Sequence, residues 1–230
     1  VNRQVEGNSS SYVAVTQGVL APELVKTFAE IEAATRVGFT TASLACNDKE
    51  AVQDRIMATD PAYFSIFTIP FKKVPSGDTL TTDGILLSEN AATRLFGEKN
   101  PVGETISLGN EIHLKVTGVF ENYPYQSHIM PEIIISFSWL EKLEPQAKSW
   151  SSNSYYNYVL MPEEFDKQAF NKKMNLFIHQ FTPASWKSFE YFLQPIRAIN
   201  LQAGYLANPR GGVGVILVNG FIMVSVIILL

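Results

Sequence analysis

The sequence predicts an α+β protein in which a domain built from β-α-β units is interrupted by a smaller, mostly β insert. A β-α-β pattern occurs near each end of the chain, and the stretch between them has short β runs separated by turn residues. With 46% hydrophobic and 17% charged residues, the 230-residue chain can bury a core and is unlike disordered proteins. Its length fits one large domain or two small ones.

The first β-α-β pattern lies near the N-terminus. Residues 12–15 are a short β-prone run, and Pro22 then stands where a first helical turn tolerates proline. Apolar side chains between residues 24 and 31 recur at the spacing of one helix face. Residues 34–44 are rich in Thr and Val-type side chains, so we expect a strand there.

The middle of the chain, residues 59–128, has a different pattern. Residues 85–87 are an apolar run that predicts a buried strand, and Ser88 is a suitable N-cap for a helix over 89–96 that ends at Gly97. Residues 113–120 alternate apolar and polar side chains, which predicts another strand. The insert is therefore expected to be a small β-rich module.

The second β-α-β pattern lies near the C-terminus. Residues 155–161 read as a strand closed by Pro162, and residues 163–181 carry apolar side chains at helical spacing. Residues 189–201 are expected to return as a strand, with Pro195 at an edge or a bulge.

The two ends of the sequence carry a further expectation. Residues 213–230 contain no charge, and a helix of that length would reach roughly 27 Å at about 1.5 Å per residue, close to the thickness of a bilayer core. We expect the start of a truncated transmembrane helix there; a buried C-terminal helix is the alternative. The chain begins at Val1 without Met or a signal peptide, which indicates a fragment boundary.

Short motifs between residues 60 and 120 occur in an order that resembles a known family. They are Asp-Pro-Ala-Tyr-Phe-Ser-Ile-Phe at 60–67, Gly-Asp at 77–78, Leu-Ser-Glu-Asn-Ala-Ala at 87–92, Leu-Phe-Gly at 95–97, Asn-Pro-Val-Gly-Glu-Thr-Ile at 100–106 and Val-Thr-Gly-Val-Phe at 116–120. Together they resemble the periplasmic core domain of MacB/FtsX-like ABC transporter permeases, in the long Bacteroidetes-type version. The resemblance covers nearly the whole chain.

The resemblance implies a domain organisation. Residues 1–58 and 129–203 would form a discontinuous porter-like αβ subdomain with a split βαβ-βαβ arrangement, and residues 59–128 an inserted sabre-like β-rich subdomain. Residues 204–212 would be a linker, and residues 213–230 the start of the transmembrane helix. Long permeases carry two such domains, and the sequence does not distinguish between them; a start close to a first membrane helix would favour the N-terminal copy.

The resemblance also implies a function. The domain would stand in the periplasm, attached to the bacterial inner membrane, and transmit ATP-driven movement to an export substrate or a periplasmic partner. Its implied partners are a cytoplasmic ATP-binding subunit, a homodimeric or second copy of the domain, and a periplasmic or outer-membrane protein. The alternatives are a membrane-anchored periplasmic sensor or lipid/lipoprotein-binding module and, more weakly, a secreted hydrolase.

The sequence predicts no enzyme, cofactor, metal or catalytic residue. Residues 97–103 are flanked by glycines but lack the Gly-Lys-Ser/Thr ending that binds phosphate. The histidines His113, His128 and His179 fall on separate predicted elements without metal-ligand spacing. The net charge of −4 argues against nucleic-acid binding, and a single cysteine, Cys46, rules out an intrachain disulfide.

Two sets of side chains allow a functional and a structural interpretation. Ser127 and His128 are neighbours and would point apart in an extended chain, so we expect His128 to hydrogen-bond where the insert meets the second half rather than to act as a base. The aromatic set could line a groove for lipid, peptide or glycan, but strand alternation favours a role in the core. It comprises Phe64, Phe67, Phe71, Tyr155, Tyr156 and Tyr158.

Overall fold

The computed structural model describes residues 2–6, 9–46, 52–74, 77–109, 112–125, 127–201 and 205–206. The chain divides into two compact units: unit 1 comprises Val1–Thr16 and Glu164–Leu230, and unit 2 comprises Gln17–Glu163. Both contain helices and strands, which confirms the mixed α+β class. The boundaries expected near residues 58 and 128 fall inside unit 2, and the division into porter-like and sabre-like subdomains stays a prediction.

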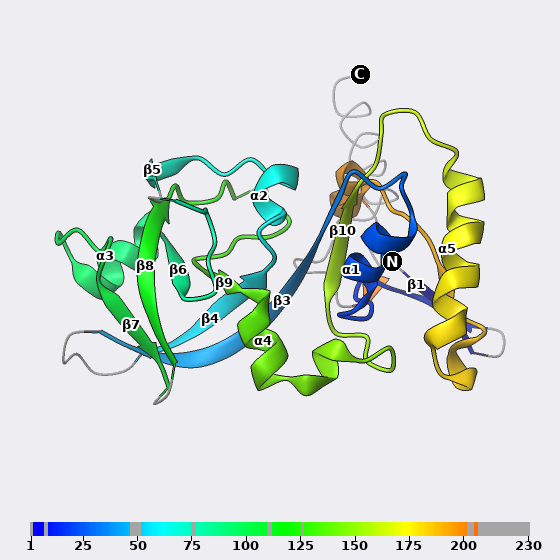
Figure 1. Cartoon of the computed structure of the whole chain (residues 1–230), viewed down its shortest axis with the longest axis horizontal. Coiled ribbons are helices and arrows are strands. Elements are labelled where there is room, and N and C mark those ends of the chain that lie inside the picture. The colour runs from blue at the N-terminus through cyan, green and yellow to red at the C-terminus, as the bar shows by residue number, and fades with distance from the viewer. Residues whose placement is uncertain are drawn as a thin grey trace, which may run out of the picture. The chain divides into compact units, whose positions relative to one another are not determined.

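Unit 2 is built on one mixed sheet (Figure 1). Its strands are β3 (Ala33–Ala45), β4 (Val52–Thr59), β5 (Phe71–Lys73), β6 (Gly84–Ser88), β7 (Thr105–Leu108), β8 (Ile112–Phe120), β9 (Ile133–Ser136) and β10 (Tyr156–Leu160). The strand order is β10-β3-β4-β9-β6-β8-β5, and β7 pairs with both β3 and β8. Six of these strands therefore close a ring, β3-β4-β9-β6-β8-β7, whose interior is filled by aliphatic side chains.

Local signals in the sequence define the centre of this sheet. All five residues of β6 are buried, because the strand pairs in parallel with β8 on one side and antiparallel with β9 on the other. The Ser88 hydroxyl accepts a hydrogen bond from the Ala91 amide at 3.1 Å and starts α3 (Glu89–Phe96). Gly97 ends this helix with a φ of +64°, a conformation that favours glycine.

Four short helical segments complete unit 2. They are α1 (Leu20–Thr27), α2 (Tyr63–Ile66), α4 (Phe137–Leu143) and the 3-10 helix η1 (Pro145–Lys148). The side chain of the N-cap residue does not cap α1. Instead, the Asn157 side chain of β10 accepts a hydrogen bond from the Ala21 amide at 3.0 Å and donates one to the Gln17 carbonyl at 2.9 Å. A strand distant in sequence thus fixes the start of this helix.

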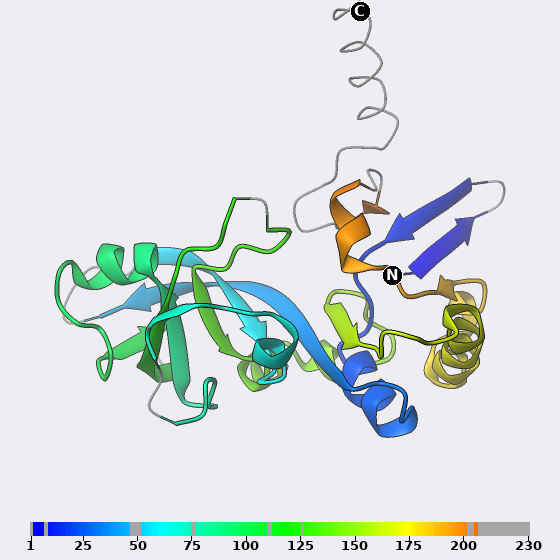
Figure 2. The same ribbon diagram turned by 90° about the horizontal axis from the view of Figure 1, so that it is seen from above.

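The long strand β3 runs through unit 2 and changes partner along its length (Figure 2). One edge of β3 pairs with β4 from Val37 to Leu44. The other edge pairs with β10 as far as Val37, and with β7 only at Leu44 and Ala45. Gly38 allows α4 to pack closely, because a Cβ at this position would lie 2.3 Å from the Leu140 Cδ2 atom.

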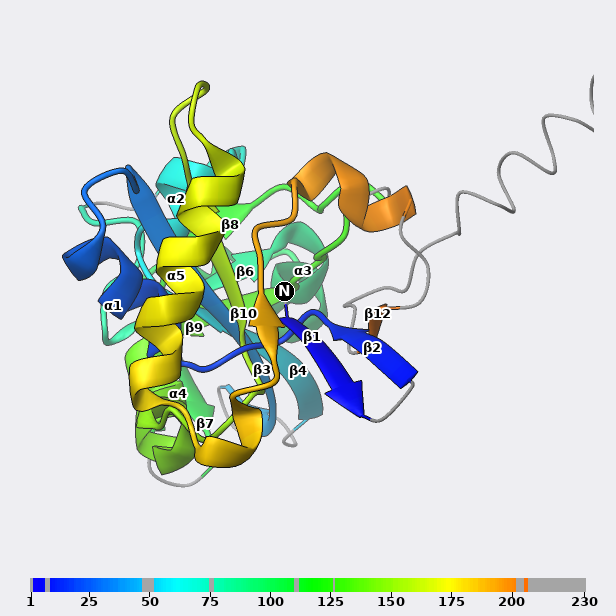
Figure 3. The same ribbon diagram turned by 90° about the vertical axis from the view of Figure 1, so that its right-hand side faces the viewer.

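Unit 1 contains a four-stranded sheet and a long helix (Figure 3). The elements are β1 (Asn2–Glu6), β2 (Ser9–Val13), β11 (Glu190–Tyr191), β12 (Tyr205–Leu206), α5 (Lys167–Phe181) and the 3-10 helices η2 (Ala184–Trp186) and η3 (Ile196–Leu201). The strand order is β11-β1-β2-β12, with β12 parallel to β2. Asp166 caps α5 by accepting from the Gln168 and Ala169 amides, both at 3.0 Å.

The strand expected over residues 189–201 is wrong in extent. Only β11, two residues long, is a strand, and the chain continues through a loop into η3. Two asparagines of α5 hydrogen-bond to backbone amides that would otherwise pair with a neighbouring strand. Asn175 Oδ1 accepts from the Tyr191 amide at 2.7 Å, and Asn171 Oδ1 accepts from the Leu193 amide at 3.0 Å. Pro195, which has no N–H, then prevents a continuous ladder.

The segment expected to enter the membrane, residues 213–230, lies outside the described residues. Of the linker expected at 204–212, only Tyr205 and Leu206 are described. None of the helices in the described ranges has the length and apolar character needed to span a bilayer.

Candidate functional site

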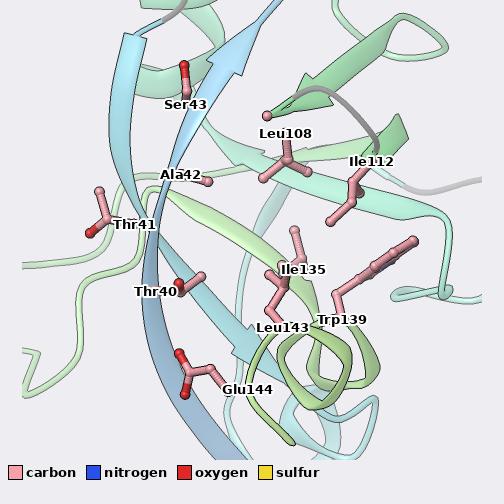
Figure 4. A pocket seen from close by; sticks show the side chains of 11 residues that line it. Thr40, Thr41, Ala42, Ser43, Leu108, Ile112, Ile135, Trp139, Leu143 and Glu144 are labelled. Atoms are coloured by element: carbon pink, nitrogen blue, oxygen red, sulfur yellow. The ribbon is translucent and has the colours of Figure 1, made fainter.

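The candidate site is a groove of about 380 Å³ in unit 2, beside β3 (Figure 4). One side is formed by residues 40–43 of β3. The opposite sides are formed by the ends of β7 and β8, by Ile135 of β9, and by Trp139, Leu143 and Glu144 in and just after α4. Most of these side chains are apolar, so the groove offers a mainly hydrophobic surface with a strand edge along it.

The strand edge can be assigned from hydrogen-bond alternation. The Ser43 carbonyl accepts from the Gly109 amide at 2.8 Å, on the side away from β4, whereas the Arg36 amide donates to the Asp60 carboxylate on the β4 side. No bulge interrupts the β3–β4 register between Val37 and Leu44. Since backbone polar groups alternate in direction along an antiparallel strand, those of Phe39 and Thr41 point away from β4.

The helix α4 supplies the apolar wall. The Trp139 indole donates from Nε1 to the Thr82 carbonyl at 2.5 Å, and the Lys142 ammonium lies 3.9 Å from the centre of the indole ring. Leu143 is 51% exposed, which is high for a leucine in a concave surface. Figure 4 shows Trp139 and Ile135 directed toward the groove and Thr41 turned away from it.

One carboxylate stands at the end of the groove. Glu144 accepts a hydrogen bond from the Tyr155 hydroxyl at 2.9 Å. Burial, together with this hydrogen bond and the negative charge of Glu144, raises the pKa of Tyr155, so the phenol remains protonated at physiological pH. The Tyr155 hydroxyl therefore holds the Glu144 carboxylate in place at the end of the groove.

An arginine network fixes α4 against the sheet. The Arg36 guanidinium of β3 donates to Asp60 through Nε at 2.9 Å and Nη2 at 2.7 Å, and to Glu141 of α4 through Nη1 at 2.6 Å. Its Cζ atom also lies 3.9 Å from the centre of the Phe137 ring. Burial by itself lowers the pKa of Arg36, but the hydrogen bonds to Asp60 and Glu141 outweigh it and the pKa is raised.

The aromatic set singled out in the sequence packs in or against the core, with Tyr155 buried and the other five residues partly buried. Phe64, Phe67, Phe71, Tyr156 and Tyr158 pack against one buried cluster, which includes Tyr63, and Tyr155 belongs to the other. The structural interpretation of these residues is therefore correct, and they do not line the groove, whose walls come from other residues.

His128 makes the type of hydrogen bond that the sequence predicted. Its Nε2 atom lies 3.2 Å from the Tyr158 hydroxyl of β10, and its ring packs near Phe67. Burial lowers the pKa of His128, which favours the neutral imidazole. The His128 ring is turned toward this aromatic cluster, with its centre 5.7 Å from the centre of the Tyr158 ring.

The other histidines lie apart from this one. The His113 Nδ1 atom is 2.9 Å from the Ser107 hydroxyl across the β7–β8 hairpin, and His179 packs near Tyr191 in unit 1. Among the described residues, no group of three or more histidine, cysteine, aspartate or glutamate side chains is arranged to hold a metal ion.

The groove itself was missed in the sequence. Its wall residues come from three stretches, 40–43, 108–112 and 135–144, that are far apart along the chain. A weak local signal was present: Thr-Thr-Ala-Ser at 40–43 interrupts the apolar character of an otherwise long strand. Such a stretch marks a strand segment whose neighbours leave it open to solvent.

Comparison with solved structures identifies similar domains. The chain is similar to a domain of a putative permease from Porphyromonas gingivalis, with 18% identity and a TM-score of 0.68, covering 84% of this chain and 86% of that one. It is also similar to the periplasmic region of MacB from Actinobacillus actinomycetemcomitans, with 16% identity and a TM-score of 0.59, covering 86% and 88%.

A third similar structure is the extracellular domain of the noncanonic ABC-type transporter YknZ from Gram-positive bacteria. The identity is 14% and the TM-score 0.56, over 79% of this chain and 90% of that one. At these identities the likeness shows the fold. No curated protein sequence matched the chain.

The sequence model described as the MacB-like periplasmic core domain matches residues 2–175. This match covers most of the chain, and the similar folds agree with it. The chain therefore belongs to the MacB-like periplasmic core domain family, which forms the periplasmic part of ABC transporter permeases.

Proposed function

We propose that this domain transmits conformational change, driven by ATP hydrolysis on a separate cytoplasmic subunit, to an export substrate or a periplasmic partner. The observation that carries the proposal is that segments from near both ends of the sequence pair in one sheet. β12 lies parallel to β2, with Tyr205 opposite Tyr12 and Leu206 opposite Val13. Movement of either segment is therefore passed to the other through backbone hydrogen bonds.

The division of the chain supports the same role. Unit 2 is one continuous stretch, Gln17–Glu163, which the chain enters and leaves once, and both flanking segments belong to unit 1. Movement imposed on unit 1 would then be passed to unit 2 through two chain connections. The closed strand ring and the Arg36 network make unit 2 suited to move as one body.

The mechanism uses contact and displacement and needs no catalytic side chain. Its expected partners are the ATP-binding subunit, a second copy of the domain, and a periplasmic or outer-membrane protein. The domain would act in the periplasm, with the permease embedded in the inner membrane.

Distance measurements between spin labels in the full-length permease test this proposal. In a Cys46→Ala background, labels at Lys172→Cys in unit 1 and Thr93→Cys in unit 2 occupy exposed positions. We expect their distance distribution to change between the nucleotide-free and ATP-bound states. The matched control pair, Thr93→Cys with Gln146→Cys, lies within unit 2 and should give the same distribution in both states.

The alternative, a membrane-anchored sensor or lipid/lipoprotein-binding module, gives the opposite pattern. Its distances would respond to a bound ligand and remain unchanged on adding ATP. A nucleotide-independent distance between the units would overturn the transmission proposal. Deletion of residues 204–214 is a second test: we expect ATP hydrolysis to continue while transport stops, and unimpaired transport would contradict the coupling role.

A further inference from the structure

We propose that the open edge of β3 is a docking site for an extended polypeptide segment, which adds to it as a short strand and places an apolar side chain in the groove. This proposal adds the chemical class of the partner to the proposed function. It rests on that function only for the role that the site would have in transport. It concerns unit 2 alone.

The edge of β3 presents backbone groups that can pair with an added strand. The N–H and C=O groups of Phe39 and Thr41 point away from β4, between the stretch of β3 paired with β10 and the stretch paired with β7. Within the part of the chain that the structure describes, no strand pairs with β3 on this side between Val37 and Ser43. An extended polypeptide offers alternating donors and acceptors at the matching spacing.

These backbone groups also favour a polypeptide over a lipid as the occupant of the groove. An acyl chain in the groove would cover the strand edge without satisfying its N–H and C=O groups, and burying an unpaired backbone group is unfavourable. A polypeptide strand satisfies these groups and also covers the apolar wall. The combination of a strand edge and a hydrophobic groove therefore favours polypeptide.

The wall of the groove has a shape and chemistry that suit an apolar side chain of such a strand. Successive side chains of an added strand would point alternately into the groove and toward solvent. A side chain pointing inward meets Ile135, Trp139 and the half-exposed Leu143. Glu144 is the one charged residue among the described residues that line the groove, so the segment is expected to be apolar at the inward position and neutral or cationic beside it.

The length of the open stretch limits what can bind. Val37 already pairs with Tyr156, and the Ser43 carbonyl is already bonded to Gly109. The distance between these two residues along an extended strand is roughly 20 Å at about 3.3 Å per residue. The site therefore takes a strand of about four or five residues, such as an exposed loop or tail of a partner protein.

The test uses a displayed library of random heptapeptides selected against the full chain, with the enriched peptides synthesised and their affinities measured by fluorescence anisotropy. Leu143→Asp places a charge in the apolar wall and should weaken binding at least tenfold. Leu176→Asp is the matched control, since Leu176 is an exposed leucine of α5 in unit 1, and it should change the affinity less than twofold. No enriched peptide, or equal affinities for the two variants, would overturn the proposal.

Backbone methylation of the peptide gives a second measurement on the unaltered chain. Moving a single N-methyl group along the best peptide removes one donor at a time, and we expect at least one position to lose tenfold or more in affinity. Equal binding at every position rules out strand addition. This result decides the question even if Leu143→Asp fails to fold. Peptide binding and the nucleotide-dependent distance are independent measurements, so the failure of one proposal is distinguishable from the failure of the other.

Discussion

Two arginines of unit 2 each bind two carboxylates, but in different surroundings. Arg36 binds Asp60 and Glu141 with 11% of its side chain exposed, whereas Arg94 of α3 binds Asp54 and Glu132 with 38% exposed. Both networks join elements that are distant in sequence. Solvent screens the charges of the Arg94 network more than those of the Arg36 network. The carboxylates that remain after loss of the arginine are therefore less well solvated in the Arg36 network.

The buried network is also the one next to the groove. Arg36 fixes Glu141 in the middle of α4, the helix that carries Trp139 and Leu143. The Arg94 network joins α3 to β4 and to the residue before β9, on a surface that does not line the groove. Similar ion pairs therefore serve different purposes in unit 2: the Arg36 network positions a candidate binding wall, and the Arg94 network adds a solvated cross-link.

The largest expected effect comes from removing the buried arginine. Arg36→Met should lower the free energy of unfolding by about 3 kcal/mol, because it removes the guanidinium from two partly buried carboxylates and leaves only Lys148 paired with Glu141. Urea denaturation followed by circular dichroism measures this change. Arg36→Lys keeps the charge but loses the bidentate geometry, and should lie between wild type and Arg36→Met. A loss below 1 kcal/mol for Arg36→Met would remove the distinction between the two networks.

Glu141→Gln separates the charge of the network from its shape. The amide oxygen can still accept from Arg36 Nη1, but the charge-assisted part of the hydrogen bond is lost, so we expect a loss of about 1.5 kcal/mol. The same denaturation experiment measures it. Because Glu141 anchors α4, the variant should also weaken binding of a groove peptide, and unchanged peptide affinity would show that α4 is held mainly by packing.

His128 is a third case, a partly buried polar group with a neutral hydrogen-bond partner, the Tyr158 hydroxyl. Its pKa is lowered by burial, so the unfolded chain binds a proton more readily, and stability is lost as the pH falls through the ordinary value of 6.5 toward the lowered folded value. Between pH 7 and 5.5 we expect a loss below about 1 kcal/mol from this residue.

The histidine contribution is measured as a difference between two chains. His128→Gln cannot titrate in this range, so the drop in stability between pH 7 and 5.5 should be smaller than in the wild type. The pKa of His179 is also lowered, by burial and then by Lys187, but that residue is present in both chains and its contribution cancels. Identical pH dependence in the two chains would exclude His128 as a contributor.

The smallest expected effect comes from the exposed network. Arg94→Ala should cost about 0.5 kcal/mol, since its ion pairs are solvated and screened. The difference from wild type should shrink further when denaturation is repeated at high salt. A loss above 2 kcal/mol that resists salt would mean that exposure of the arginine is a poor guide to the importance of its network.

The sequence predicted the elements whose limits are set by neighbouring residues. The strand β6 and the helix α3 agree with expectation because Ser88 and Gly97 are local start and stop signals. The strand over 189–201 failed because Asn171 and Asn175, some twenty residues earlier, take its backbone groups. That competition depends on tertiary structure and leaves no local pattern.

The candidate site was beyond the reach of sequence patterns for the same reason. An open edge on β3 exists only because β10 and β7 pair with its two ends and leave the middle uncovered. Strand register decides this, and register between distant strands cannot be obtained from one sequence. The aromatic residues that the sequence did single out proved to be packed in or against the core.

The short open stretch of β3 also bears on self-association. An uncovered strand edge is normally a hazard, because copies of a protein can pair edge to edge and grow into aggregates. Here the stretch ends at Val37 on one side and at Ser43 on the other, where β10 and the β7 turn already occupy the strand. A full-length strand from another copy would collide with these neighbours. The edge can therefore pair with a short peptide strand but cannot nucleate a continuous intermolecular sheet.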